Sequence, residues 1–83
     1  MNLLHAFAPS LEGRPDEPGL EFGEQTFSFR KIDERSNQIA YLLQSRGFNM
    51  GDRLAVYLEN CPEFIFLFLA AAKLGVIFVP VNI

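Results

Sequence analysis

Residues 52–81 read DRLAVYLENCPEFIFLFLAAAKLGVIFVPV, and this stretch decides the fold. Residues 54–58 are apolar without alternation, which is typical of a parallel strand covered on both faces, because half-buried strands alternate. A second continuous run, at residues 76–79, is rich in β-branched side chains. Residues 64–74 lie between the two runs and have the composition of a helix. The order strand, helix, strand predicts a βαβ unit.

Both ends of this helix carry sequence signals. Asn60 can accept a hydrogen bond from a free backbone amide, and Glu63 follows it at the spacing of a capping box. Pro62 suits the first turn, where no amide donor is needed. Gly75 can adopt the left-handed conformation that ends a helix, and Pro80 closes the strand that follows. The sequence therefore predicts Asn60 as the N-cap and Gly75 as the end of the helix.

The composition is that of one globular domain at most. The chain has 83 residues, of which 49% are hydrophobic, and a net charge of -3. Because no Lys/Arg cluster is present to neutralise phosphates, we exclude nucleic acid as a partner. Cys61 is the single cysteine, so no intrachain disulfide or thiolate zinc site can form. This fits a reducing cytoplasm, and residues 1–10 lack a secretory signal; a position at the periphery of a membrane is the alternative.

Residues 64–81 are nearly long and apolar enough to span a bilayer. Lys73 would then lie near the middle of the span, where a charge costs about 2.5–3.5 kcal/mol on insertion scales. At Gly75 the composition also changes from helix-forming Leu and Ala to strand-forming Val, Ile and Phe. We therefore predict no membrane span, and a membrane-associated segment remains an alternative.

Residues 1–19 are interpreted as an N-terminal arm. They begin with a short apolar patch at residues 3–7 and continue with Pro, Gly and charged residues, which disfavour regular structure. Residues 20–22 and 25–27 then flank the Gly-Glu pair at residues 23–24. Glycine at the first central position suits a type II′ turn, so we predict a short β-hairpin.

An amphipathic helix follows, from Ser28 as the N-cap to about Arg46. Its main apolar positions share one face. They are Ile32, Ile39, Ala40 and Leu43. Polar residues lie mostly opposite, among them Asp33 and Glu34, so we expect one buried side and one solvated side. Gly47 supplies the left-handed residue after the helix.

These elements predict the α/β class, as a βαβαβ fragment of a larger layered α/β domain preceded by a short β-hairpin. The second helix is apolar all round, and its large side chains cannot all face one sheet. A chain of this length must seal its apolar surface well to offset the loss of conformational entropy. We therefore expect residues 20–83 to be a partial N-terminal domain, truncated at its C-terminal end.

No residue pattern indicates a catalytic, cofactor-binding or metal site. His5 is the single histidine and lies in the arm, where we expect it to be solvated. Cys61 has no base nearby in the sequence, and we interpret it as a small buried residue. Gly47 and Gly51 do not form a nucleotide fingerprint, because neither G-x-G-x-x-G nor G-K-[ST] is present.

Two further patterns have structural explanations. Asp33 and Glu34 are adjacent, hence on different parts of the helix, and this arrangement is typical of a solvated face. Phe64, Phe66 and Phe68 resemble an aromatic box, but we interpret them as core. We therefore predict no catalytic, cofactor-binding or metal-binding residues in this chain.

Several short blocks occur in a fixed order along the chain. They are residues 26–37 (TFSFRKIDERSN), 46–47 (RG), 51–56 (GDRLAV), 60–64 (NCPEF), 71–75 (AAKLG) and 79–82 (VPVN). Together they resemble the N-terminal stretch of adenylate-forming ligases, the AMP-binding family of acyl-CoA synthetases, luciferases and peptide-synthetase adenylation domains. The resemblance covers nearly all of residues 20–83. The family usually carries an acidic residue where Lys31 stands, a departure that affects only the capping of the helix.

The resemblance implies an enzyme that uses ATP and Mg²⁺ to convert a carboxylic acid into an acyl-adenylate and pyrophosphate. The acyl group then passes to a thiol, most often that of coenzyme A (CoA), and fatty acid metabolism is the implied setting. In the family, the phosphate loop, the adenine and ribose segments and the catalytic lysine all follow the region matched here. The resemblance therefore implies a scaffold that is inactive alone, with acid and CoA bound by later segments.

Two other functions stay open on the residues alone. A stand-alone α/β interaction module would be a monomer or dimer that unfolds cooperatively. A membrane-associated segment would resist extraction with alkaline carbonate. We expect the N-terminal portion of an acyl-CoA synthetase-like enzyme, because of the ordered blocks and the unsealed apolar helix.

Overall fold

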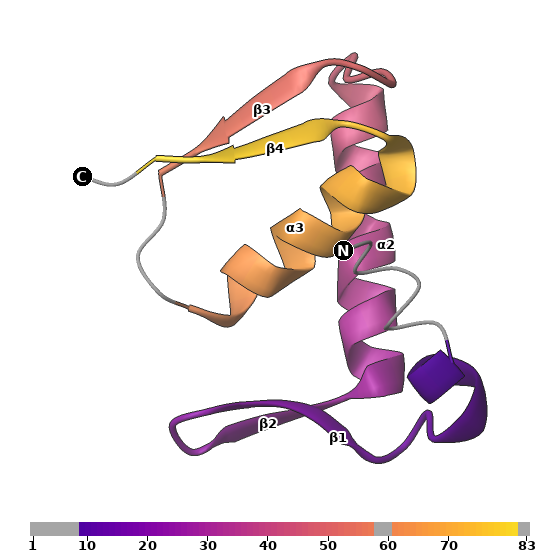
Figure 1. The fold of residues 1–83 in the computed structure, drawn as a ribbon. Coiled ribbons are helices and arrows are strands. Elements are labelled where there is room, and N and C mark those ends of the chain that lie inside the picture. Colours follow the sequence, from indigo (N-terminus) through magenta and orange to yellow (C-terminus); the bar gives the residue numbers. More distant parts are fainter. Residues whose placement is uncertain (1–8, 58–60, 82–83) are drawn as a thin grey trace.

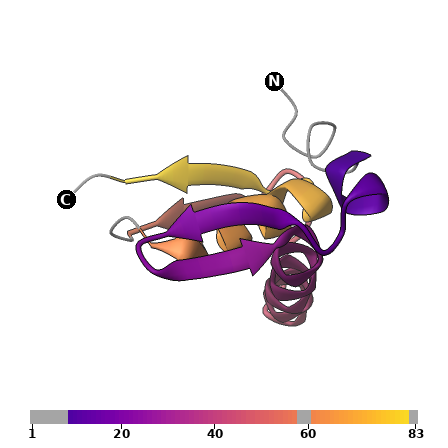
Figure 2. The same ribbon diagram turned by 90° about the horizontal axis from the view of Figure 1, so that it is seen from below.

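The described part of the chain forms two two-stranded sheets and two long helices (Figure 1). The computed structural model describes residues 9–57 and 61–81. The strands are β1 (Pro18–Phe22), β2 (Gln25–Ser28), β3 (Arg53–Val56) and β4 (Ile77–Pro80), and the helices are α2 (Phe29–Ser45) and α3 (Pro62–Leu74). Helix α3 lies between the β1–β2 hairpin and the β3–β4 sheet, and Figure 2 views α2 nearly end-on beside them. The predicted α/β class is confirmed.

The βαβ unit is present as predicted. Strands β3 and β4 pair in parallel, with Leu54 opposite Phe78. Helix α3 connects them and packs on one face of the pair, where the rings of Phe64 and Phe68 meet the Phe78 ring edge-on, each at 5.2 Å between centroids. Strand β3 ends at Val56, and Leu58 lies outside the described residues.

The predicted hairpin is also confirmed. Strands β1 and β2 are antiparallel, and Phe22 pairs with Gln25 across a two-residue turn. Gly23 has a φ of +59°, and no non-glycine residue in the described part of the chain has a positive φ. This combination is that of a type II′ turn, which matches the right-handed twist of the flanking strands.

The hairpin forms a sheet of its own. Among the described residues, β2 pairs with β1, and β3 pairs with β4. Leu20 and Phe27 of the hairpin pack instead against a buried cluster of Ile32, Phe66 and Leu69 from the two helices. The first strand of the predicted βαβαβ series, β2, therefore does not join the parallel sheet. It pairs with β1 and covers the helices.

The start of α2 is held by its N-cap and by the preceding loop. The Ser28 hydroxyl accepts a hydrogen bond from the Lys31 amide at 3.1 Å, as predicted. The Phe29 amide donates to the Glu17 carbonyl at 3.2 Å, and the Arg30 amide donates to the Pro15 carbonyl at 2.8 Å. Residues 9–13 form a helical turn, so the expectation of no regular structure in this segment is wrong. Carbonyls of the predicted arm satisfy helix amides that would otherwise need water.

Both long helices end at glycines in the left-handed conformation, as predicted. Gly47 has a φ of +91° and Gly75 a φ of +72°. After α3, the Val76 amide donates to the Ala71 carbonyl at 2.9 Å, which satisfies a free carbonyl of the last turn. Leucine and alanine favour the helix up to this point, and the glycine lets the chain turn back into β4.

The predicted N-cap of α3 is wrong. The cap is Cys61, which makes no side-chain capping hydrogen bond, and Pro62 is the first helical residue. Asn60, and with it the predicted capping box, lies outside the described residues, and Glu63 stands in the first turn. A residue before proline is restricted to extended conformations, and Cys61 accordingly has φ -155° and ψ 163°. The proline therefore decides where the helix begins.

The core lies where α2 meets α3. Of the predicted apolar positions of α2, Ile32, Ala40 and Leu43 are buried and Ile39 is half-buried. They pack against Phe66, Leu69 and Ala70 of α3 in two clusters. Among residues 9–57 and 61–81, no helix combines the length and hydropathy that a membrane span requires.

Candidate functional site

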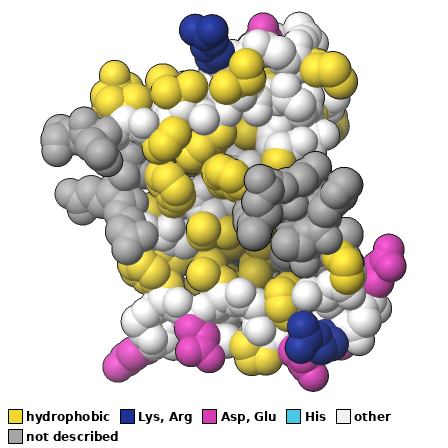
Figure 3. Space-filling model, in the orientation of Figure 1, with side chains coloured by type: hydrophobic (Ala, Val, Ile, Leu, Met, Phe, Trp, Pro, Cys, Tyr) yellow, Lys and Arg dark blue, Asp and Glu magenta, His cyan; other side chains and the backbone are white. Residues whose placement is uncertain are grey.

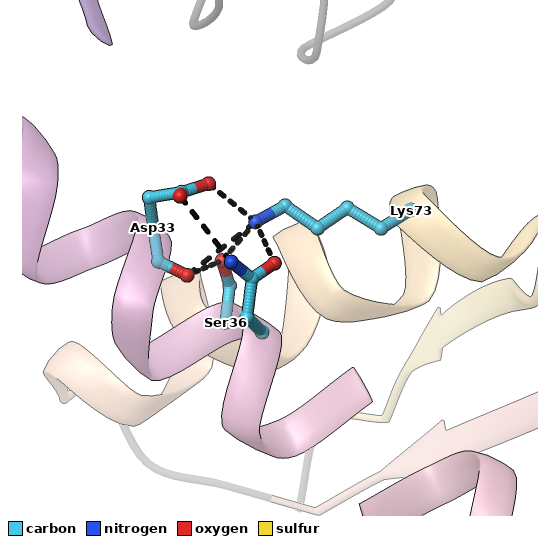
Figure 4. Close-up of polar contacts among 4 residues, drawn as sticks. Asp33, Ser36 and Lys73 are labelled. Carbon is cyan, nitrogen blue, oxygen red and sulfur yellow. Dashed lines mark hydrogen bonds and ion pairs between the residues drawn. The ribbon is translucent and has the colours of Figure 1, made fainter. Parts of the chain in front are cut away.

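Four polar side chains join α2 to the last turn of α3, and we name Asp33, Ser36, Asn37 and Lys73 the Lys73 cluster (Figure 4). The Lys73 Nζ atom donates to Asp33 Oδ1, to Ser36 Oγ and to Asn37 Oδ1, each at 2.7 Å. The Lys73 and Asp33 side chains are 19% and 29% exposed, and Ser36 is fully buried. The cluster therefore forms an ion pair that is largely shielded from solvent.

One turn of α2 supplies all three acceptors. Positions 33, 36 and 37 lie on the same face because neighbours three and four apart are adjacent on a helix. The Ser36 hydroxyl also donates to the Asp33 carbonyl at 2.9 Å, and the Asn37 amide donates to Asp33 Oδ2 at 3.3 Å. Within the described residues, every buried side-chain polar atom has a hydrogen-bond partner. The cluster is thus fully satisfied, as a stable buried polar network requires.

The geometry gives Lys73 a structural role. An ammonium has three N–H donors and no lone pair, and three short acceptors occupy those donors here. The Asp33 carboxylate is held by the ammonium and by Asn37. The two groups therefore hold each other and join α2 to α3.

Sequence reasoning missed this cluster. Asp33 was expected on a solvated face, and that expectation is wrong, because Lys73 of α3 partly covers it. Glu34 is exposed, as expected. Two signals point to the cluster in retrospect: polar residues at spacings of three and four on α2, and one lysine in the otherwise apolar second half of α3. Only the packing of α3 on α2 brings them together.

The other residues considered as site candidates either pack in the core or do not come together into a site. Phe66 is buried, while Phe64 and Phe68 are half-buried against Phe78, so their interpretation as core residues is confirmed. Cys61 is half-buried at the start of α3 and is therefore less enclosed than expected. His5 lies outside the described residues. Residues 9–57 and 61–81 contain no group of three or more His, Cys, Asp or Glu side chains that could hold a metal ion.

A small open groove of about 250 Å³ lies between β2, α2 and the first half of α3. It is lined by Gln25, Phe27, Arg35, Gln38, Ile39, Glu63 and Phe66. Cavities that enclose a typical small ligand measure roughly 300–1,000 Å³. The groove falls below that range and carries one side chain of each charge, so it lacks the size and the converging polar groups of a cofactor site.

The outer face of the β3–β4 sheet is exposed and, apart from Arg53 at the start of β3, apolar. Ala55 of β3 lies on this face, as do Tyr57, which directly follows β3, and Ile77 and Val79 of β4. Tyr57 is 63% exposed and Ile77 48% exposed. Figure 3 shows hydrophobic side chains gathered on the side of the molecule that carries β4 and α3. A parallel sheet is normally covered on both faces, whereas residues 9–57 and 61–81 cover this sheet on one face only.

Comparison with known proteins gives a consistent match. The family model described as AMP-binding enzyme matches residues 7–83. Crotonobetaine/carnitine–CoA ligases of Salmonella paratyphi A and Salmonella typhimurium are 48% identical to the chain over 56 residues. That alignment covers 68% of this chain and 11% of each ligase. The chain therefore spans about a tenth of the length of these curated relatives.

Solved structures show the same arrangement of elements. The N-terminal subdomain of NpsA from Klebsiella oxytoca superposes with a TM-score of 0.89 at 30% identity, over 98% of this chain and 21% of that one. The o-succinylbenzoate CoA synthetase (MenE) of Bacillus subtilis superposes with a TM-score of 0.87 at 26% identity, over 92% of this chain and 16% of that one. Because the family model covers almost the whole sequence, the chain belongs to the AMP-binding enzyme family of adenylate-forming enzymes.

Proposed function

We propose that this chain is the N-terminal scaffold of an AMP-forming acid–thiol ligase of the acyl-CoA synthetase type. Such an enzyme joins a carboxylate to the α-phosphate of ATP with loss of pyrophosphate, and a thiol then displaces AMP to give a thioester. The observation that carries the proposal is the family match over residues 7–83. The named CoA ligases among its relatives favour CoA as the acceptor thiol.

The exposed sheet face supports a scaffold role. Tyr57, Ile77 and Val79 are 63%, 48% and 37% exposed, so covering them would gain part of the roughly 1.5–3 kcal/mol that complete burial of a large apolar side chain contributes. A covering layer would therefore be stabilised by contact with this face. We accordingly propose residues 1–19 as an arm and residues 20–83 as the opening part of a larger N-terminal domain.

We propose that the described residues act as scaffold and take no part in the chemistry. They contain no cluster of carboxylates that could bind Mg²⁺. The groove beside β2 is too small for a nucleotide. A wider, open depression of about 580 Å³ is lined by residues 37–45 of α2 alone and has no charged side chain to meet phosphates. The sequence also has no glycine-rich phosphate loop. The residues present therefore do not fit ATP or Mg²⁺, and no step of adenylation is assigned to them. We propose a carboxylic acid of fatty acid metabolism as the substrate class and the cytoplasm as the location.

The 83-residue chain alone should not exchange radioactive pyrophosphate into ATP in the presence of Mg²⁺ and a panel of carboxylic acids. The physical reason is that it lacks both a metal-binding cluster in its described part and a phosphate-binding loop. An intact crotonobetaine/carnitine–CoA ligase assayed with its own substrate is the positive control. Exchange above background by the purified chain would refute the scaffold function.

A further inference from the structure

Helix α3 has no single apolar face that fixes its rotation. Apart from Pro62 at its start, its buried residues are Phe66, Leu69, Ala70 and Ala71. Phe64, Ile65, Leu67 and Phe68 are apolar and half-buried on the remaining sides. A helix that is hydrophobic all round can bury similar apolar area in several rotations about its axis. Hydrophobic burial alone therefore does not select one arrangement of α3.

The contact with α2 near the end of α3 is also apolar. Ala70 is fully buried and belongs to one cluster with Ala40 and Leu43 of α2. Ile39, Phe48, Leu54 and Leu74 pack around this cluster. Apolar contacts of this kind have no fixed direction, so they favour burial more than any one register.

The Lys73 cluster provides the missing directional contact. Three acceptors on one turn of α2 receive the three donors of one ammonium at 2.7 Å each. A slip of α3 by one turn would move the ammonium by about 5.4 Å and break all three contacts at once. It would also leave the buried Ser36 hydroxyl and the half-buried Asp33 carboxylate without the lysine. Unpairing such a charge disfavours a misaligned state on the order of a hundredfold or more.

We propose that the Lys73 cluster is a register lock, which selects one packing arrangement of α3 on α2. Its effect extends to the parallel sheet, because α3 passes through Gly75 directly into β4. The Gly75 carbonyl accepts from the Gly51 amide at 2.9 Å, and the Ile77 amide donates to the Asp52 carbonyl at 2.7 Å. The lock therefore also sets where β4 begins opposite β3.

Replacing both charged partners with apolar side chains, in Asp33→Leu/Lys73→Met, tests the lock. This double variant leaves no unpaired charge, and Ser36 keeps its hydrogen bond to the residue 33 carbonyl. We expect helix content by circular dichroism and the urea midpoint to stay near those of the wild-type chain. In ¹H–¹⁵N NMR spectra, signals of residues 66–76 should divide into sets with populations within tenfold of each other. The wild-type chain should show any minor set at roughly one part in a hundred or less.

The matched control is Lys31→Met/Glu34→Leu, which replaces an exposed ion pair on α2, 3.9 Å between Lys31 Nζ and Glu34 Oε2, with the same two apolar side chains. It should keep one set of signals. One sharp set in the Asp33→Leu/Lys73→Met variant, with the same α2–α3 contacts as in the wild type, would overturn the proposal. Loss of helix content in that variant would also overturn it, because the cluster would then supply stability and not register.

Discussion

Replacing Phe66 with alanine should lower the free energy of unfolding by about 3–5 kcal/mol. Phe66 is 4% exposed and meets the Phe27 ring edge-on at 5.3 Å between centroids. It packs in the cluster with Ile32 and Leu69, where both helices and the hairpin meet. Truncation would leave a cavity shared by these elements, and a small domain has little stability in reserve.

Urea denaturation followed by circular dichroism measures this loss. The control is Tyr41→Ala on the outer side of α2, where the side chain is 76% exposed and the change should stay within about 0.5 kcal/mol. Equal losses for the two variants would show that Phe66 does not occupy the shared core.

The single variant Lys73→Met should lower the free energy of unfolding by about 2–3 kcal/mol. This loss is smaller than that for breaking a fully buried ion pair, because the Asp33 side chain is still 29% exposed to solvent. Methionine fills a similar volume, so the loss reports the unpaired Asp33 carboxylate rather than a cavity. Adding Asp33→Leu to this variant removes that carboxylate and should restore most of the stability. This recovery separates the cost of an unpaired charge from the net contribution of the pair.

Thermal and urea unfolding of the single and double variants form a double-mutant cycle for this coupling. Lys31→Met is the surface control, because the Lys31 side chain is 48% exposed and its pair with Glu34 is expected to contribute less than about 0.5 kcal/mol. A Lys73→Met variant as stable as Lys31→Met would contradict the assigned ion pair.

The elements that the sequence predicts well are those coded by local runs. The apolar stretches around Leu54 and Phe78 and the helix between them decide the βαβ unit without any distant contact. Gly75 marks the end of α3 because a left-handed residue is needed there. The Gly23 turn is equally local. Such signals act within a few residues, so they can be interpreted from the sequence without knowing how the helices and strands pack.

The missed features depend on contacts between distant residues or on competing local rules. Lys73 and Asp33 lie 40 residues apart, and only the packing of α3 on α2 joins them. The side chain of Asn60 favours it as the N-cap, but the extended conformation before Pro62 makes Cys61 the cap. The position of the hairpin also follows from packing, since Leu20 and Phe27 lie against the buried cluster of the two helices.

The most direct test of the scaffold account is thioester formation by a chimera. Residues 20–83 would replace the homologous segment of the Salmonella typhimurium crotonobetaine/carnitine–CoA ligase, to which the chain is 48% identical over 56 residues. A form of that ligase lacking the segment is the negative control. We predict that the chimera forms the CoA thioester at a rate within about tenfold of the intact ligase, equivalent to about 1.4 kcal/mol in the barrier. A chimera that folds to the same helix content but forms no thioester would contradict the account.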